Sequence, residues 1–191
     1  MKLFTGIELA PAVARAAGTL IDELKRKAEQ QAPRARVTWV TEERLHVTVR
    51  FIGHTDEAGY DRIRAVLEPP IDVAPFAFIV ERLGSFPPSG QPRVLWAGIS
   101  GDEASLRSLE HEVTARLVPA GIPPEPRDYN PHLTLGRVKE AGGLKAATLF
   151  RDRTDIVLGT TSVQAITLFE SRVSSKGPTY VPLQKTLLKR R

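Results

Sequence analysis

The chain has 191 residues, of which 41% are hydrophobic and 26% are charged. These proportions are typical of a globular domain that can bury a core, and they exclude a mainly disordered chain. Cysteine is absent, which excludes disulfides, thiolate catalysis and iron–sulfur clusters, while the formal net charge of +5 favours a polyanionic partner such as nucleic acid.

The first half of the sequence predicts a strand, a helix and then further strands. Residues 2–9 form a short apolar run that predicts a strand, and Pro11 suits the first turn of a helix that continues to about Gln30. The elements expected next are strands at 36–40 and 45–53, a helix at 56–67, a strand at 76–83 and a turn-rich loop at 85–92.

The second half predicts the same order of elements. They are a strand at 93–100, a helix from Asp102 to about Leu117, a Pro- and Gly-rich connection, a strand at 132–138, and strand-like runs at 151–159, 161–173 and 178–188. Two stretches also repeat in sequence: LFTGI at 3–7 is similar to LWAGI at 95–99, and HVTV at 46–49 is similar to HLTL at 132–135. We therefore expect an α+β protein with antiparallel sheets, built from a duplicated strand–helix–strand half.

Two of the four histidines lie in the same frame, which is His, apolar, Thr, apolar. Residues i and i+2 of a strand point to the same face, so one frame places His46 beside Thr48 and the other places His132 beside Thr134. A solvent-facing strand position would explain one such frame alone, but two frames by chance are expected on the order of once in a thousand. If the halves meet about a twofold axis, the imidazoles can act as base and acid at one phosphorus atom, with the hydroxyls binding its oxygens.

These residues resemble the two-histidine (2H) phosphoesterase superfamily, and within it the bacterial and archaeal 2′-5′ RNA ligase group, whose members are described as RNA 2′,3′-cyclic phosphodiesterases. The resemblance rests on LFTGIEL at the start, LHVTVRFIG, PRVLWAGI, YNPHLTLGR and the late LFES. The family usually has Leu where this chain has Val49. The resemblance implies one bilobal domain over residues 1–191, with approximate halves 1–91 and 92–191 that can exchange strands, a central cleft lined by the sheets, and helices outside.

The resemblance also implies an activity and roles for individual residues. The activity is hydrolysis of a terminal 2′,3′-cyclic phosphate to a 2′-phosphomonoester, with reversible 2′-5′ ligation when an RNA 5′-hydroxyl replaces water. His46 would be the general acid, His132 the general base, and Thr48 and Thr134 the phosphate ligands; the acid and base roles could be exchanged.

Four further residues are candidates for substrate binding. Phe51 and Tyr129 resemble the family's aromatic residues at the terminal base, where a ring can stack on any base, and Arg137 resembles its phosphate-contacting arginine. By strand alternation Arg50 shares the face of His46 and could reach an RNA phosphate. The alternatives are solvated surface roles for the two arginines, and core packing for Phe51 unless a bulge redirects it.

No metal or cofactor is expected, because HExxH, a phosphate-binding GxxxxGK[ST] loop and a clustered acidic triad are all missing. With no signal peptide and no run of 18 apolar residues, we expect a cytoplasmic location and no membrane partner. The leading hypothesis is a metal-independent phosphodiesterase whose partner is RNA ending in a 2′,3′-cyclic phosphate. The alternatives are a 2H enzyme acting on a small cyclic-phosphate nucleotide, and a non-catalytic module that binds RNA ends.

Overall fold

The fold is described from a computed structural model, which describes residues 1–174 and 177–189. Nine strands of the described chain form one antiparallel sheet in the order β7-β4-β5-β6-β3-β1-β8-β9, with β2 pairing with β6. The strands are β1 (Lys2–Glu8), β2 (Arg36–Trp39), β3 (His46–His54), β4 (Phe76–Phe86), β5 (Val94–Gly101), β6 (His132–Glu140), β7 (Val157–Val163), β8 (Ala165–Ser174) and β9 (Gly177–Leu187). The helices are α1 (Pro11–Gln31), α2 (Glu57–Leu67), α3 (Glu103–Leu117) and α4 (Ala146–Leu149), with 3-10 turns η1 (Glu42–Arg44), η2 (Val118–Ala120) and η3 (Arg151–Arg153).

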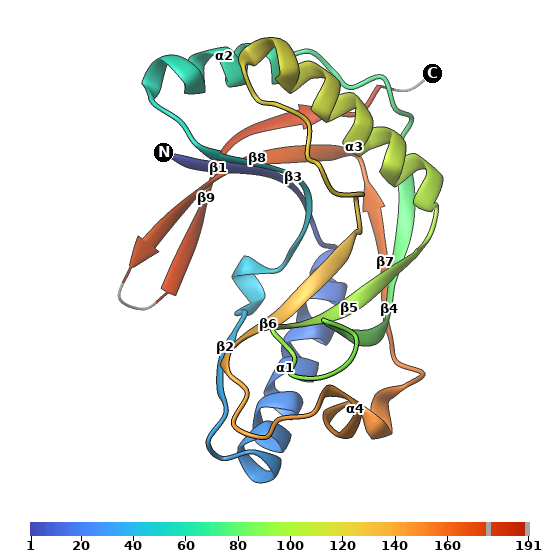
Figure 1. Ribbon diagram of the computed structural model, residues 1–191. Coiled ribbons are helices and arrows are strands. Elements are labelled where there is room, and N and C mark those ends of the chain that lie inside the picture. Colours follow the sequence, from blue (N-terminus) through green and yellow to red (C-terminus); the bar gives the residue numbers. More distant parts are fainter. Residues whose placement is uncertain (175–176, 190–191) are drawn as a thin grey trace.

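The sheet curls into two lobes, which Figure 1 shows above and below its centre. One lobe holds β3, β1, β8 and β9 with α2 and α3, and the other holds β2, β4, β5, β6 and β7 with α1 and α4. In the described chain the lobes join through one strand pair, in which Val47 of β3 lies opposite Leu133 of β6.

Each lobe draws strands from both halves of the sequence. Strand β8 from the second half pairs with β1, while β4 from the first half pairs with β5 and β7. The helices cross in the same way, because α1 follows β1 but packs on β7, and α3 follows β5 but packs on β3. The spatial lobes are therefore different from the sequence halves 1–91 and 92–191.

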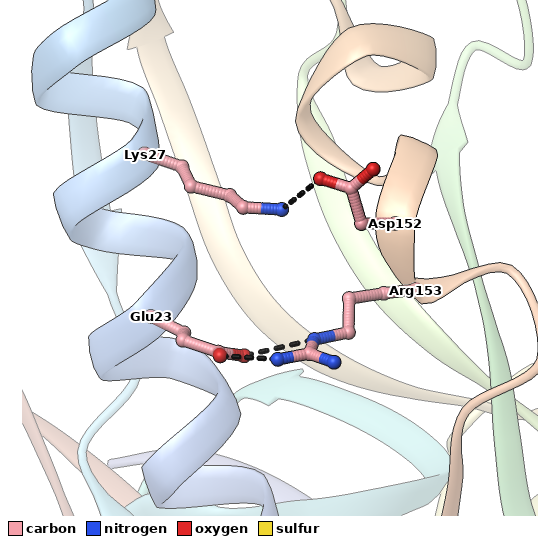
Figure 2. A network of polar contacts seen from close by, with 4 residues as sticks. All are labelled: Glu23, Lys27, Asp152 and Arg153. Atoms are coloured by element: carbon pink, nitrogen blue, oxygen red, sulfur yellow. Dashed lines mark hydrogen bonds and ion pairs between the residues drawn. The ribbon is translucent and has the colours of Figure 1, made fainter.

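Helix α1 shows why these residues fold as they do. Its first residue is Pro11, which has no backbone N–H to leave unpaired. Its buried side chains recur every three or four residues and form one apolar face: Val13, Ala17, Leu20, Ile21, Leu24 and Ala28. On a neighbouring face, Glu23 pairs with Arg153, and Lys27 lies 3.1 Å from Asp152, which ties α1 to η3 (Figure 2).

Three predicted elements differ from the structure. The run at 151–159 is not one strand, because its first residues form η3 against α1 and the strand begins only at Val157. The run at 161–173 is divided at Gln164, whose carbonyl accepts a hydrogen bond from the Leu188 N–H. Strand β4 continues to Phe86 into the expected loop, since Phe86 still pairs with Val94. No helix of residues 1–174 and 177–189 has the length and apolar character to cross a membrane.

Candidate active site

The structure brings the two His-x-Thr frames together where the lobes join. Val47 and Leu133, which form the connecting pair, each follow directly after a histidine. Because β3 and β6 run antiparallel, the two frames lie side by side in opposite directions. His46 and His132 are near enough that the positive charge of His132 lowers the pKa of His46.

Both imidazoles are held in the same way by the backbone two residues before them. The Nδ1 atom of His46 lies 2.8 Å from the carbonyl oxygen of Arg44, and that of His132 lies 2.8 Å from the carbonyl oxygen of Asn130. A carbonyl can only accept, so we assign the proton of each neutral ring to Nδ1, which leaves the Nε2 lone pair free. Each ring is thus ready to accept a proton at Nε2, or to donate one from Nε2 when charged.

Aromatic side chains contact both imidazoles. The ring centroid of His46 lies 4.8 Å from that of Phe4 and 5.0 Å from that of Tyr180. The centroid of His132 lies 5.1 Å from that of Phe86. A side chain at Gly6 would crowd this packing, because its Cβ would lie 3.3 Å from Cδ2 of His46.

Burial among these rings lowers the pKa of His46 and of His132, since desolvation disfavours the charged imidazolium. The nearby charge of Arg137 also lowers the pKa of both histidines. Hydrogen bonds to the carbonyls of Arg44 and Asn130 oppose these effects. One guanidinium therefore lies close enough to influence both imidazoles.

Two β-bulges determine which residues face the histidines. In β3, Thr48 pairs with Gly6 and Arg50 with Thr5, so Val49 is the extra residue. In β6, the extra residue is Leu135, which holds the same position in its frame as Val49: Thr134 pairs with Trp96, and Gly136 pairs with Leu95. An extra residue reverses the alternation of side chains beyond it. Phe51 and Arg137 therefore return to the histidine face. Each lies five residues after its histidine.

Phe51 is accordingly exposed rather than part of the core. Its side chain is 55% exposed, and its ring centroid lies 6.4 Å from that of Phe4, which in turn contacts His46. The alternative of core packing is wrong for Phe51, because the bulge at Val49 redirects it. Its role in binding a base stays a prediction, which its exposed position beside Phe4, a neighbour of the imidazole, favours.

Arg50 lies on a different face of β3 from the one predicted. The same bulge turns it away from His46 and Thr48, and it is only 3% exposed. Its Nη1 lies 2.6 Å from Oε1 of Glu125, and its Nη2 donates to the carbonyl of Pro123. Both the shared face with His46 and the solvated surface role are therefore wrong for Arg50.

Tyr129 is half-buried, and its hydroxyl is engaged by the first frame. The Tyr129 hydroxyl donates to the backbone carbonyl of Thr48 over 3.0 Å, and Arg107 donates to the carbonyl of Tyr129 over 2.9 Å. Burial raises the pKa of Tyr129, so this hydroxyl stays protonated and keeps donating. Base contact by its ring stays a prediction.

Sequence reasoning missed the aromatic contacts of the histidines. A signal was present, because Phe4 in LFTGI and Trp96 in LWAGI occupy the same place in the repeat. Phe4 packs beside His46, while Trp96 lies opposite Thr134 and packs on Phe86, with 5.2 Å between ring centroids. The repeat thus marks one aromatic residue on the strand next to each histidine strand.

One hollow of the surface lies at the site, and a larger one lies away from it. A cavity of about 180 Å³ adjoins His46 and is bordered by Phe169 of β8 and Tyr180 of β9. A larger groove of about 650 Å³ lies between α1 and β2, but it contains none of the predicted site residues. In the part of the chain that the structure describes, no group of three His, Cys, Asp or Glu side chains is arranged to hold a metal ion.

A curled antiparallel sheet with two His-x-Thr strands at its centre is the architecture of a two-histidine phosphoesterase. The chain belongs to the 2′-5′ RNA ligase superfamily, whose family model matches residues 11–172. Together these findings confirm the predicted α+β class and the predicted family.

Two curated relatives have the same name. A protein of Aeropyrum pernix named RNA 2′,3′-cyclic phosphodiesterase is 36% identical over 145 residues, which are 75% of this chain and 82% of that protein. A protein of Archaeoglobus fulgidus with the same name is 29% identical over 184 residues, which are 96% of this chain and 98% of that protein.

Solved structures support the fold over the whole chain. The crystal structure of TT0787 of Thermus thermophilus has a TM-score of 0.80 at 25% identity and covers 100% of this chain and 99% of its own. The Escherichia coli LigT structure, in a complex with 3′-AMP, has a TM-score of 0.73 at 19% identity and covers 99% and 98% of the two chains.

Proposed function

We propose that this protein is an RNA 2′,3′-cyclic phosphodiesterase that opens a terminal 2′,3′-cyclic phosphate to a 2′-phosphomonoester. The observation that carries the proposal is the antiparallel meeting of the two His-x-Thr frames at Val47 and Leu133. Relatives with 28–36% identity named RNA 2′,3′-cyclic phosphodiesterase support the reaction.

The reaction needs one proton removed and one proton supplied. A neutral imidazole takes the proton of the attacking water at Nε2 while the water oxygen bonds to phosphorus. The bond from phosphorus to the ribose O3′ breaks, and the other histidine, as imidazolium, gives its Nε2 proton to O3′. We propose His46 as this acid and His132 as the base, in line with the resemblance. Both hydrogen bonds to backbone carbonyls support this use of Nε2.

Charge builds up on the non-bridging phosphoryl oxygens as water attacks. Thr48 and Thr134 each lie two residues after a histidine, on the same face of the strand. Their hydroxyls can therefore donate to these oxygens. Arg137, which lowers the pKa of both histidines, can neutralise the same charge. When the anion binds, it favours the imidazolium form that the acid needs.

The residues that follow the histidines in β3 and β6 favour RNA over a small nucleotide as the substrate. After the bulge at Leu135, Arg137 returns to the histidine face of β6. Lys139 follows two residues further on, as the extra residue of a bulge against β2, and both side chains are exposed. Two cations in line along a strand suit successive backbone phosphates. The exposed ring of Phe51 suits stacking on a base near the terminal phosphate. A substrate with only one nucleotide would leave Lys139 unused.

The test is turnover of an RNA oligomer that ends in a 2′,3′-cyclic phosphate, in excess EDTA. We expect hydrolysis, with the phosphate of the product on the 2′ position and a free 3′-hydroxyl. Retention of the oligomer without hydrolysis would favour the binding-module alternative. A kcat/KM for a mononucleoside 2′,3′-cyclic phosphate equal to that of the oligomer would favour the small-nucleotide alternative.

A sulfur substrate tests the assignment of acid and base. Sulfur in place of the 3′ oxygen leaves without needing a proton, so such a substrate restores turnover to a variant that lacks the acid but not to one that lacks the base. We expect His46→Ala to regain activity and His132→Ala to stay inactive. The reverse result exchanges the two roles and leaves the proposed reaction in place.

A further inference from the structure

The segment that leads into His132 is held in place by side chains. It contains four prolines, at 123, 124, 126 and 131, and proline has no N–H to donate. Residues 123–131, all of which the structure describes, make no hydrogen bond between backbone groups. Its position must therefore come from contacts with other elements.

Arg50 of β3 supplies the first of these contacts. Its buried guanidinium donates to Oε1 of Glu125 over 2.6 Å and to the carbonyl of Pro123. A buried charge is costly unless it is paired and hydrogen-bonded, so the loop and the guanidinium stabilise each other in one arrangement. Arg50 stands in the same strand as His46, four residues further on.

Tyr129 supplies the second contact. Its hydroxyl donates to the carbonyl of Thr48, a residue of the first frame, and Arg107 of α3 fixes the Tyr129 carbonyl. The next carbonyl, that of Asn130, accepts from Nδ1 of His132. A continuous set of contacts therefore runs from the strand of His46 to the imidazole of His132.

We propose that Arg50, Glu125 and Tyr129 are positioning residues, which clamp residues 123–131 onto β3 and thereby set the place of the second imidazole relative to the first. None of the three needs to touch RNA for this role. The link to turnover rests on the proposed function, whereas the placement of His132 can be tested without substrate. Misplacement of a catalytic group by about 1 Å can cost roughly 10²-fold in rate, so the clamp is expected to act on kcat.

Three variants test the clamp. Glu125→Ala and Tyr129→Phe each remove one contact at a partly exposed position, and Arg50→Lys keeps the charge but loses the forked donor. The matched control is Arg153→Gln, which breaks an ion pair between elements away from the histidines (Figure 2). For the three clamp variants we expect kcat on a cyclic-phosphate oligomer to fall about 10- to 100-fold with KM changed by less than about threefold. The control should lower the melting temperature at most and keep kcat.

NMR titration of the histidine rings without substrate provides the second measurement. We expect Glu125→Ala and Tyr129→Phe to move the titration curve of His132, and Arg153→Gln to leave it in place. Unchanged titration and unchanged kcat in folded clamp variants would overturn the proposal. A rise in KM alone in Arg50→Lys would overturn it in favour of an RNA phosphate contact. If no variant and no wild-type protein turned over the oligomer, the proposed function would fail, and the titration would still decide on the clamp.

Discussion

Val47 and Leu133 lie opposite each other at the one point where β3 and β6 pair, and each directly follows a histidine. Any change in this register would move both imidazoles at once, because the frames are fixed to the two strands that form the pair. The chain also crosses between the lobes, because α1 follows β1 of one lobe and packs on β7 of the other, while α3 follows β5 and packs on β3. The two lobes, and the two histidine strands with them, are therefore tied together by the path of the chain as well as by this strand pair.

The two histidines should be required together. We expect His46→Ala or His132→Ala to lower kcat about 10²- to 10⁴-fold, because each removes one proton transfer. The double variant should cost little more than the worse single variant, since the two act as a unit. Single-turnover hydrolysis of a cyclic-phosphate oligomer measures the rate, and fluorescence anisotropy should show binding largely retained. His111→Ala, at an exposed position of α3, is the control. Loss confined to one of the two histidines would contradict paired action.

The positive charge of Arg137 should affect the pH dependence of kcat/KM. Turnover needs one neutral and one charged imidazole, and burial and Arg137 lower the pKa of both from about 6.5. The acidic limb of kcat/KM, where the second proton binds, should therefore lie below pH 6.5. Arg137→Gln removes a positive charge that opposes protonation, so the pKa of each histidine should rise and both limbs should move to higher pH.

The position of the limbs is the measurement, because loss of a phosphate contact will also lower the height of the profile. Arg153→Gln, which removes a distant guanidinium, should leave the limbs where they are in the wild-type protein. Limbs that stay in place in Arg137→Gln, or that move to lower pH, would show that Arg137 does not act on the imidazoles.

The fold class and the chemistry could be predicted from the sequence because they rest on local patterns. The paired frames place a hydroxyl beside each imidazole on any regular strand, and both strands begin at the histidine, within one residue of the expected starts at 45 and 132. The regular alternation of side chains between the two faces of the sheet does not continue beyond Val49 and Leu135. Both are apolar and buried, as regular core-facing residues would be, so nothing in the sequence distinguishes an extra residue from a regular one.

The contacts of Arg50 could not be predicted for a different reason. Its partner Glu125 is 75 residues away in a proline-rich connection without regular structure. Only the tertiary arrangement brings that connection onto β3, and a periodic pattern carries no information about it. Strand alternation therefore predicts that Arg50 faces solvent or substrate, although the fold buries it against a loop.

Lys139 should contribute to binding long RNA but not a single nucleotide. It follows two residues after Arg137 in β6, in the direction away from the histidines, and its side chain is exposed. Lys139→Gln should raise KM for an oligomer severalfold and leave KM for a mononucleoside 2′,3′-cyclic phosphate unchanged. The slope of log affinity against log salt should fall by about 0.7, the value for one lost contact with a single strand. Lys145→Gln, at the exposed start of α4, is the charge-matched control. An equal effect of both variants would mean that general charge, and not a position on β6, attracts the RNA.

Phe51 should bind substrate without supporting the fold. The residue is 55% exposed, and its ring lies beside Phe4, which in turn contacts His46. Stacking of a base on such a ring contributes about 1–3 kcal/mol. Phe51→Ala should therefore raise KM for the oligomer about 5- to 150-fold, with the melting temperature nearly unchanged. Phe51→Trp should retain most of the affinity, because it still offers a flat ring. Val157→Ala removes an equally exposed apolar side chain at the start of β7 and should change neither KM nor stability appreciably. A melting temperature that drops by several degrees in Phe51→Ala, with KM unaltered, would instead make this ring part of the packing around Phe4.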